Sequence, residues 1–277
     1  MAEPDEINEL GPGLWRLPLR TPTLPPATRT NTYVLGQRQL CVVDPAPVDA
    51  EEQEQLLEFL KARRREGAHL AALVLTHHHG DHVGATTVLH ERLGIPVAAH
   101  AETAARVKVP VALVLKDGDH LPCDGPSWTA IFTPGHAAGH LCFLRSSDRT
   151  LIAGDMVAGV GTILVDPDEG SMSQYMASLR RLLALHPRTL LPAHGHALPD
   201  GVAHLNEYIH HRNARAEAVL ERLHAGDETP TQMVPHIYVG VPVFMYPLAA
   251  RSVMSILLQH VEEGRARRVG EDSFRPL

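Results

Sequence analysis

Short apolar runs alternate with amphipathic segments along the first two thirds of the chain. The runs are rich in aliphatic and β-branched residues and are bounded by glycine, proline or polar residues, as strands usually are. We therefore expect strands over residues 14–17, 31–35, 40–44, 70–75, 95–99, 128–132, 150–153 and 189–191. Residues 36–39 separate two of these strands and predict a hairpin. The run at 70–75 holds no polar residue, which is typical of a strand buried on both faces.

Helical periodicity appears between the strands. Apolar residues recur at helical spacing over 51–65, 83–93 and 172–183. Acidic residues open the first of these segments and arginines close it, an order of charge that suits the helix dipole. Because the strand–helix order occurs twice, the sequence predicts an α/β sandwich of two similar halves.

Beyond about residue 200 the pattern becomes helical. We expect an amphipathic helix over 205–223, a short helix after Thr229, a longer helix over 248–262, and two β-like fragments at 265–269 and 273–275. Three helices followed by a small ribbon resemble a winged-helix module. The sequence therefore predicts two domains, residues 1–199 and residues 200–277.

Composition narrows the class of protein. The chain of 277 residues is 44% hydrophobic and 21% charged, an ordinary globular balance. Its net charge of −7 argues against a general nucleic-acid binder or a polybasic membrane-surface protein. The start is acidic and no apolar run approaches the ~20 residues that span a bilayer, so we expect a cytoplasmic protein with no membrane segment. The three cysteines lack disulfide-scaffold or zinc-ribbon spacing.

Histidine is abundant, with 19 residues, and four potential metal ligands follow the buried strand 70–75 as His77-x-His79-x-Asp81-His82. Three further polar side chains come at or just past the ends of later strands. Ligands of α/β sheets bind outside the carboxyl ends of the strands, so these loops can converge at one edge. Five imidazoles and two carboxylates suit two transition-metal ions, and this donor set favours zinc, although iron or manganese stays open. The candidate ligands are His77, His79, Asp81, His82, His136, Asp155 and His194.

These motifs resemble those of the metallo-β-lactamase-fold superfamily over about residues 10–200. The resemblance implies a four-layer αββα sandwich with the metals at one edge. It implies that one zinc ion is held by His77, His79 and His136, and the second by Asp81, His82 and His194. Asp155 would bridge the two ions. Metal-bound water has a pKa near 7, so a bridging hydroxide would attack the substrate, with Asp81 and Asp155 as catalytic residues.

Several other residues are candidates for supporting or substrate-binding roles. His78 is out of phase with the ligands and is expected to face substrate or solvent, whereas His140 and His196 are expected to support ligands or to lie in loops. Arg212 and Arg215 could bind an anionic substrate at the metal cleft or could lie on a solvated helix face. Tyr175, on the helix 172–183, is a third candidate substrate contact.

Within the superfamily, the chain is most similar to the lactamase-β-like-protein-two group, which carries a C-terminal winged helix. The matching features are Asn31-Thr-Tyr33, Asp166-Pro-Asp-Glu-Gly170 and His211-Arg212. Secreted β-lactamases lack the bridging carboxylate that Asp155 matches. Glyoxalase II shares the ligands, but its basic glutathione-binding pattern is absent from residues 200–277. Persulfide dioxygenases place a single iron on a related triad.

Three functions stay open. The first is hydrolysis of a small ester or thioester, possibly linked to CoA or a carrier protein, with apolar residues 156, 157 and 163–165 as a substrate wall. The second is cleavage of single-stranded RNA, with Arg212, Arg215 and the arginines of 265–268 as phosphate contacts. The third is a DNA-binding regulator with a metal-sensing site. Residues 200–277 hold 8 basic and 10 acidic side chains, which favours a cap or homodimer contact over nucleic-acid binding for this module.

Overall fold

The computed structural model describes residues 6–277 and separates the chain into two compact units. The first comprises Met1–Thr133, Ala138–Ile163 and His186–Val202, and the second comprises Pro134–Ala137, Leu164–Leu185 and Ala203–Leu277. The predicted domain boundary at residues 199 and 200 stays a prediction, but the last crossing between the units lies close to it, after Val202. The acidic residues 1–5 lie outside the described part of the chain.

The first unit begins with a sheet that is seven-stranded within the described residues, its strands side by side in sequence order. Strands β1 to β4 are antiparallel, and β4 to β7 are parallel. The predicted hairpin is confirmed as β3 and β4. The strands are β1 (Asn8–Gly11), β2 (Leu14–Arg20), β3 (Arg29–Leu35), β4 (Gln39–Val43), β5 (His69–Val74), β6 (Val97–Ala99) and β7 (Val111–Val114).

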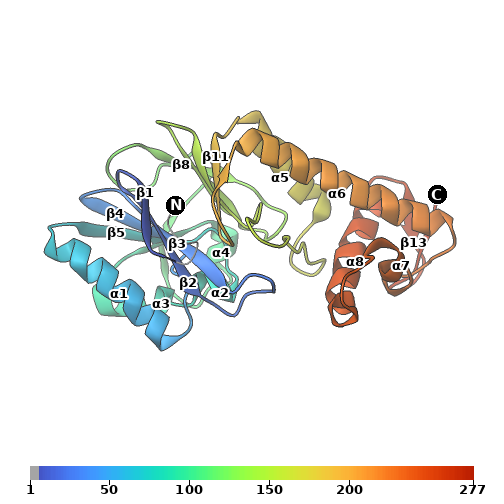
Figure 1. Ribbon diagram of the computed structural model, residues 1–277, viewed down its shortest axis with the longest axis horizontal. Helices are drawn as coiled ribbons and strands as arrows, with labels where there is room; N and C mark the ends of the chain where they lie inside the picture. Colours follow the sequence, from blue (N-terminus) through green and yellow to red (C-terminus); the bar gives the residue numbers. More distant parts are fainter. Residues whose placement is uncertain (1–5) are drawn as a thin grey trace. The chain divides into compact units, whose positions relative to one another are not determined.

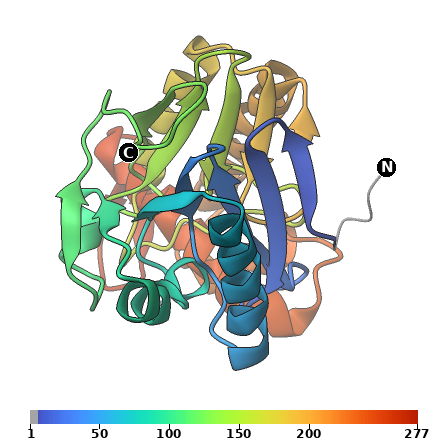
Figure 2. The same cartoon turned by 90° about the vertical axis from the view of Figure 1, so that its left-hand side faces the viewer.

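Helices cover one face of this sheet. In Figure 2, α1 (Ala50–Arg65) crosses the sheet's outer face. Asp49 caps this helix by accepting a hydrogen bond from the Glu51 backbone, and leucines from one side of the helix pack onto the sheet. The helix predicted over 83–93 is in fact two, α2 (Gly80–Val83) and α3 (Thr86–Leu93). The helices are separated at Gly84 and Ala85, where the Ala85 N–H donates to the Pro45 carbonyl at 2.9 Å and so makes its bond outside the helix. Gly84 packs so closely on the Ala46 carbonyl that a Cβ would lie 2.6 Å from its oxygen. A third short helix is α4 (Ala101–Ala104).

A second sheet, five-stranded within the described residues, belongs to the same unit (Figure 1). Its strands are, in spatial order, β12 (Leu198–Pro199), β11 (Thr189–Pro192), β10 (Thr150–Gly154), β9 (Leu141–Arg145) and β8 (Trp128–Phe132). Only the β10–β11 pair is parallel among the described strands of this sheet. The two sheets share one buried core, which contains Tyr33, Leu35, Val43, Val74, Trp128, Phe143, Ile152 and Leu191. The first unit is therefore layered as helices, sheet, sheet.

The second unit contains the remaining helices and a small ribbon. Thr229 and Gln232 form a reciprocal capping box at the start of α7, and Val253, Leu257 and Phe274 are buried. The predicted three helices and ribbon of the C-terminal module are confirmed. The elements are α5 (Met172–Ala184), α6 (Gly201–His224), α7 (Pro230–Ile237), η1 (Val243–Met245), α8 (Tyr246–Glu262), β13 (Ala266–Arg268) and β14 (Phe274–Pro276). Across residues 6–277, no helix combines the length and the apolar character needed to cross a membrane.

Candidate metal centre

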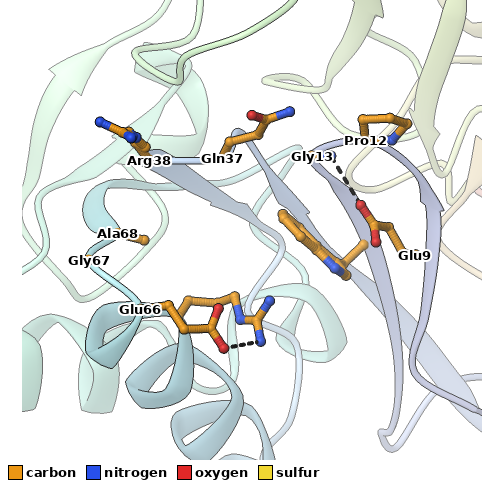
Figure 3. Close-up of a pocket in the computed structure, with 10 residues that line it drawn as sticks. Glu9, Pro12, Gly13, Gln37, Arg38, Glu66, Gly67 and Ala68 are labelled. Carbon is orange, nitrogen blue, oxygen red and sulfur yellow. Dashed lines mark hydrogen bonds and ion pairs between the residues drawn. The ribbon is translucent and has the colours of Figure 1, made fainter.

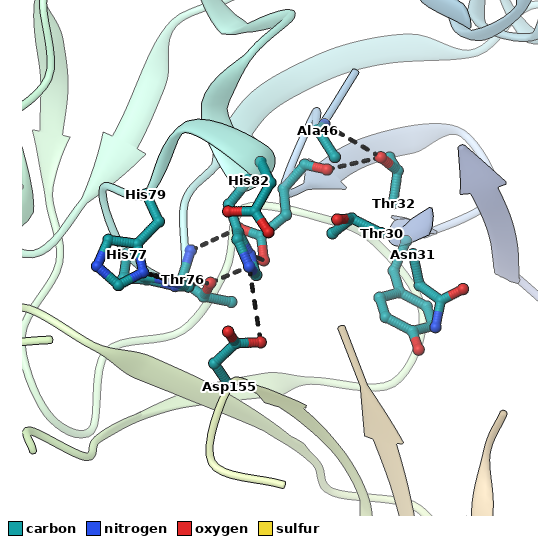
Figure 4. Close-up of polar contacts among 12 residues, drawn as sticks. Thr30, Asn31, Thr32, Ala46, Thr76, His77, His79, His82 and Asp155 are labelled. Carbon is teal, nitrogen blue, oxygen red and sulfur yellow. Dashed lines mark hydrogen bonds and ion pairs between the residues drawn. The ribbon is translucent and has the colours of Figure 1, made fainter. Parts of the chain in front are cut away.

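Six of the seven predicted ligands belong to the first unit, and all six follow the carboxyl ends of strands. His77, His79, Asp81 and His82 come after β5, while Asp155 follows β10 and His194 follows β11. Figure 4 shows His77, His79, His82 and Asp155 drawn together between the two sheets. His77 and His82 are fully buried, and only 6% of Asp155 and of His194 is exposed.

The side-chain atoms of these residues lie close enough to share ions. Asp155 Oδ1 is 3.3 Å from His194 Nε2 and 3.6 Å from His82 Nε2. Asp81 Oδ2 lies 3.7 Å from His194 Nε2, and His77 Nε2 lies 2.9 Å from His79 Nδ1. Two overlapping triads each have their ligand atoms within 4.8 Å of one another: His77 with His82 and Asp155, and Asp81 with His82 and His194. Ligand atoms at this spacing can coordinate the same cation.

The orientation of the imidazoles supports the same interpretation. His194 Nδ1 lies 3.1 Å from the Arg29 carbonyl oxygen, which can only accept a hydrogen bond, so Nδ1 carries the proton and Nε2 offers a lone pair. His82 Nδ1 likewise donates to Asp44 Oδ2 at 2.9 Å. Its Nε2 is buried and has no hydrogen-bond partner among residues 6–277. A buried ring nitrogen without a hydrogen-bond partner is costly, and coordination of a divalent cation would satisfy it, so the residues present fit a metal.

Charge within the cluster is strongly coupled. Burial disfavours a charged His82, but the carboxylates of Asp155 and Asp44 outweigh burial and raise the pKa of this imidazole well above its usual value. At His194 burial lowers the pKa, but the Asp155 carboxylate outweighs burial, so the pKa of this imidazole is raised. Burial would raise the pKa of Asp155, yet the two imidazoles hold it well below its usual range. Positive charge is therefore favoured beside Asp155.

Asp44 is the functional residue that the sequence interpretation missed. It is buried at the end of β4, and its Oδ1 accepts the Thr76 N–H at 2.7 Å. Oδ2 accepts both the Thr76 hydroxyl at 2.7 Å and His82 Nδ1 at 2.9 Å. Asp44 thus fixes the start of the ligand loop and the tautomer of His82. The signal was available, because Asp44 follows a buried strand directly, just as the ligands do.

The Asn31-Thr-Tyr33 motif holds the loops on either side of the cluster. Asn31 Nδ2 donates to the carbonyls of Pro192 at 2.9 Å and Gly195 at 2.8 Å, and Tyr33 donates to the Pro192 carbonyl at 2.8 Å. Thr32 donates its hydroxyl hydrogen to the Asp44 carbonyl at 2.6 Å. Figure 4 shows Asn31 and Thr32 beside the cluster. The motif therefore positions the loop of His194 and the turn at Asp44 without contributing a ligand.

His140 has the supporting role that the sequence predicts. Its Nε2 accepts the Asp155 backbone N–H at 3.1 Å, so its Nδ1 is the protonated nitrogen and donates to the Thr133 hydroxyl at 2.9 Å. Gly154 has φ +50°, and a Cβ there would lie 2.6 Å from His140 Nε2. Only glycine therefore lets the backbone of Asp155 reach this histidine.

The other predicted residues belong to the second unit. His136 donates from Nδ1 to the Leu164 carbonyl at 2.8 Å, which makes Nε2 the unprotonated nitrogen of the neutral ring. Tyr175 is fully buried, and the Arg212 guanidinium lies 5.1 Å from the centre of its ring. Arg215 lies 4.2 Å from the ring of Tyr238 and donates to a backbone carbonyl. A substrate role for Tyr175, Arg212 and Arg215 stays a prediction.

Two surface hollows of the first unit bear on substrate binding. A hollow of about 240 Å³ is lined by the loop before β3 and by the residues directly after His194, namely Pro18, Pro26, Ala27, Thr28, Arg29, Asn31, Val160, Gly195 and His196. The other, of about 630 Å³, lies at the end of α1 around Trp15 and Arg63 (Figure 3). No candidate metal ligand is among the residues that line this second hollow. No candidate ligand lines the smaller hollow either, but Gly195 of its lining directly follows His194.

Two facing sheets with a buried His/Asp cluster at the strand ends define a metal-dependent hydrolase. Residues 25–194 match the model of the metallo-beta-lactamase superfamily, and residues 229–275 match that of the beta-lactamase associated winged helix domain. The chain belongs to the metallo-beta-lactamase superfamily. The predicted family, α/β fold class, winged helix and hydrolase class are thereby confirmed.

Relatives and solved structures agree with this assignment. The chain is 30% identical over 267 residues to the lactamase-like protein adaB of Aspergillus niger, covering 89% of this chain and 79% of the relative. It is 27% identical over 252 residues to the beta-lactamase-like protein 2 homolog of Caenorhabditis elegans, covering 89% and 83% of the two chains.

Among solved structures, the chain is similar to the metallo-beta-lactamase family protein TTHA1429 of Thermus thermophilus. The identity is 26% and the TM-score 0.81, covering 97% of this chain and 100% of the other. It is also similar to TTHA1623 in a di-iron-bound form, at 27% identity and a TM-score of 0.54, covering 68% and 96%.

Proposed function

We propose that the protein is a dinuclear zinc hydrolase of small esters or thioesters. The observation that carries this proposal is the position of Asp155, which lies within 4.8 Å of ligand atoms of His77 and His82 and whose Oδ1 is 3.3 Å from His194 Nε2. A carboxylate near His77 on one side and near His82 and His194 on the other suits a bridge between two cations. Asp81, His82 and His194 would hold one ion.

His77 and His79 would hold the other ion together with His136. Support for His136 comes from the chain itself, because the segment Pro134–Ala137 is joined at both ends to residues of the first unit, Thr133 and Ala138. His136 Nδ1 donates to the Leu164 carbonyl at 2.8 Å, so in the neutral ring Nε2 is the nitrogen that carries the lone pair a metal needs. The nitrogen and oxygen donors favour zinc, while the di-iron form of a related structure makes iron the alternative to test.

Bound divalent cations would supply Lewis-acid chemistry and an activated water at neutral pH. The side chains set where this chemistry happens. The Asp155 side chain is buried and is held by its backbone bond to His140, so it fixes the centre of the cluster. The Asp81 side chain is 18% exposed, twice the 9% of Asp155, and so faces the substrate side. We assign to Asp81 a role in orienting the attacking water, whose proton its carboxylate oxygen would accept in a hydrogen bond.

The arginines of the ribbon argue for a small substrate over RNA. Arg265 pairs with Glu217 and Glu263, and Arg268 donates to the Gly270 and Glu271 carbonyls. Phosphate contacts would have to break these interactions. The same engagement disfavours a DNA-binding role for the ribbon.

The apolar substrate wall expected after Asp155 takes a different form. Met156 and Val157 are fully buried and Ile163 is 4% exposed, so these residues pack in the interior. The apolar surface next to the cluster is that of the 240 Å³ hollow, where prolines, Ala27 and Val160 surround one cation, Arg29. This lining fits an acyl group with a negatively charged or polar end, such as a CoA- or carrier-linked thioester.

The proposal is tested by metal analysis coupled to a substrate screen. We expect about two ions per chain, and hydrolysis of acyl thioesters that disappears on chelation and returns with zinc. The screen should include single-stranded RNA at 50 and 200 mM salt, because phosphate-driven binding would fall steeply over that range. RNA cleavage without thioester hydrolysis would contradict the proposed substrate, and a protein that binds no ions would contradict the whole assignment.

A further inference from the structure

The segment 164–171, here called the clasp, surrounds the turn that carries His136. His136 Nδ1 donates to the Leu164 carbonyl at 2.8 Å, and the Ser171 N–H donates to the Gly135 carbonyl at 2.8 Å. The two segments are so close at Gly170 that a Cβ there would lie 2.3 Å from the Gly135 carbonyl oxygen. The clasp therefore determines the ring orientation and tautomer of His136.

The clasp is itself a tight turn built on Asp166. Its carbonyl accepts the Gly170 N–H at 2.8 Å, and its Oδ1 accepts the Asp168 N–H at 2.9 Å. A partly buried carboxylate of this kind favours a positive charge beside it.

Arg251, on α8 of the C-terminal module, supplies that charge. Its Nε donates to Asp166 Oδ2 at 2.5 Å, and its Nη2 donates to both Asp166 Oδ1 and Asp168 Oδ2. Isolated surface ion pairs contribute little to stability. A bidentate arginine–carboxylate contact that also includes a second carboxylate is stronger and can fix the conformation of a loop. The exposed fraction of the Asp166 side chain is 25%, so this pair is partly shielded from solvent.

We propose that Arg251, in the C-terminal module, is a positioning residue for the candidate metal ligand His136. The inference rests on the proposed function in one respect, namely that His136 is a ligand. The route is short: Arg251 fixes Asp166, Asp166 shapes the clasp, and the Leu164 carbonyl of the clasp orients His136. The module matched by the winged-helix model thus has a task that requires no nucleic acid.

The test compares two variants of this route with a matched control. Arg251→Ala removes the ion pair, and Arg251→Lys keeps the charge but loses the planar fork. Arg222→Ala is the control, because Arg222 also pairs with one carboxylate of the same unit, Asp227 at 2.7 Å, but does not contact the clasp. If Arg251→Ala fails to fold, Asp166→Asn replaces it, since asparagine can still accept the Asp168 N–H.

The readouts are zinc affinity, from competition with a chelating dye, and hydrogen exchange of the Gly170 and Ser171 amides. For Arg251→Ala we expect about a tenfold weaker affinity for one of the two ions and faster exchange at both amides. Arg251→Lys should recover only part of both, and Arg222→Ala should match the wild type.

Two results would overturn the inference: unchanged affinity and exchange in Arg251→Ala, or equal losses in Arg251→Ala and Arg222→Ala. Failure of the proposed function would look different, because the wild type itself would then bind no zinc. In that case the exchange of the clasp amides still decides whether Arg251 holds the clasp.

Discussion

Replacement of Asp44 by asparagine tests how far the metal centre depends on a residue that is not a ligand. Asp44 has φ +49°, a conformation that asparagine also tolerates, so the backbone should be preserved. The amide keeps one oxygen for the Thr76 N–H. Its NH₂ group, however, then faces His82 Nδ1, which donates to Oδ2 in the wild type at 2.9 Å. Two donors cannot pair, so His82 must move its proton to Nε2 or turn away.

The loss of stability and the loss of zinc affinity can both be estimated. Loss of a hydrogen bond to a buried charged group costs about 1.5–3 kcal/mol of stability in the ion-free protein. A proton on Nε2 blocks the lone pair that His82 offers to the cluster. Removing such a supporting partner typically weakens metal binding by about 10- to 100-fold, or roughly 1.4–2.7 kcal/mol.

Zinc titration of the ion-free protein against a chromophoric chelator gives the affinity, and urea unfolding of the same sample gives the stability. Asp124→Asn is the matched control, because Asp124 accepts the backbone N–H groups of Gln37, Arg38 and Gln39 at 2.7–3.1 Å without contacting a candidate ligand. The control should lose stability and keep its zinc affinity. If Asp44→Asn also loses only stability, Asp44 is structural and our account of the His82 tautomer is wrong.

Three further outcomes are expected. Asp155→Ala should lose one ion and more than tenfold of the turnover while its circular dichroism stays native, and full turnover would contradict the bridging role. His78→Ala should keep both ions by elemental analysis, because His78 is out of phase with the ligands at His77 and His79; loss of an ion would show that the ligand phase is wrong. Removing metal by dialysis against a chelator should lower the unfolding midpoint, and added zinc should restore it; an unchanged midpoint would mean that the cluster holds no ion in the folded state.

The ligand motif could be recognised from the sequence because its four residues are contiguous and follow an unmistakable buried strand. Asp155 and His194 were found by the same rule, applied to later strands. Asp44 escaped because it stands alone after its strand, and its partnership with His82 arises only when β4 and β5 pair side by side. Single-residue contacts between neighbouring strands leave no spacing pattern.

Four of the described strands, β1, β7, β9 and β12, were not predicted, and two of them were missed for a related reason. In β7, Leu113 and Val114 are 40% and 51% exposed, so this edge strand is defined by pairing with β6 rather than by burial. In β9, Leu141 follows His140 directly, and the polar cluster before it hides the start of the strand. The helix break after Val83 likewise depends on a tertiary partner, the Pro45 carbonyl, which accepts the Ala85 N–H. Patterns along the chain predict elements well where burial alone defines them, and poorly where a tertiary partner does.

Asn31 ties a strand of one sheet to the chain reversal that carries His194 in the other, through bonds to the Pro192 and Gly195 carbonyls. Because these bonds join the two sheets at the edge where the candidate ligands lie, the sheets cannot separate there unless the bonds break. A bound ion should therefore dissociate only as fast as these bonds open, and the rate of isotopic zinc exchange would report the rate of that local opening.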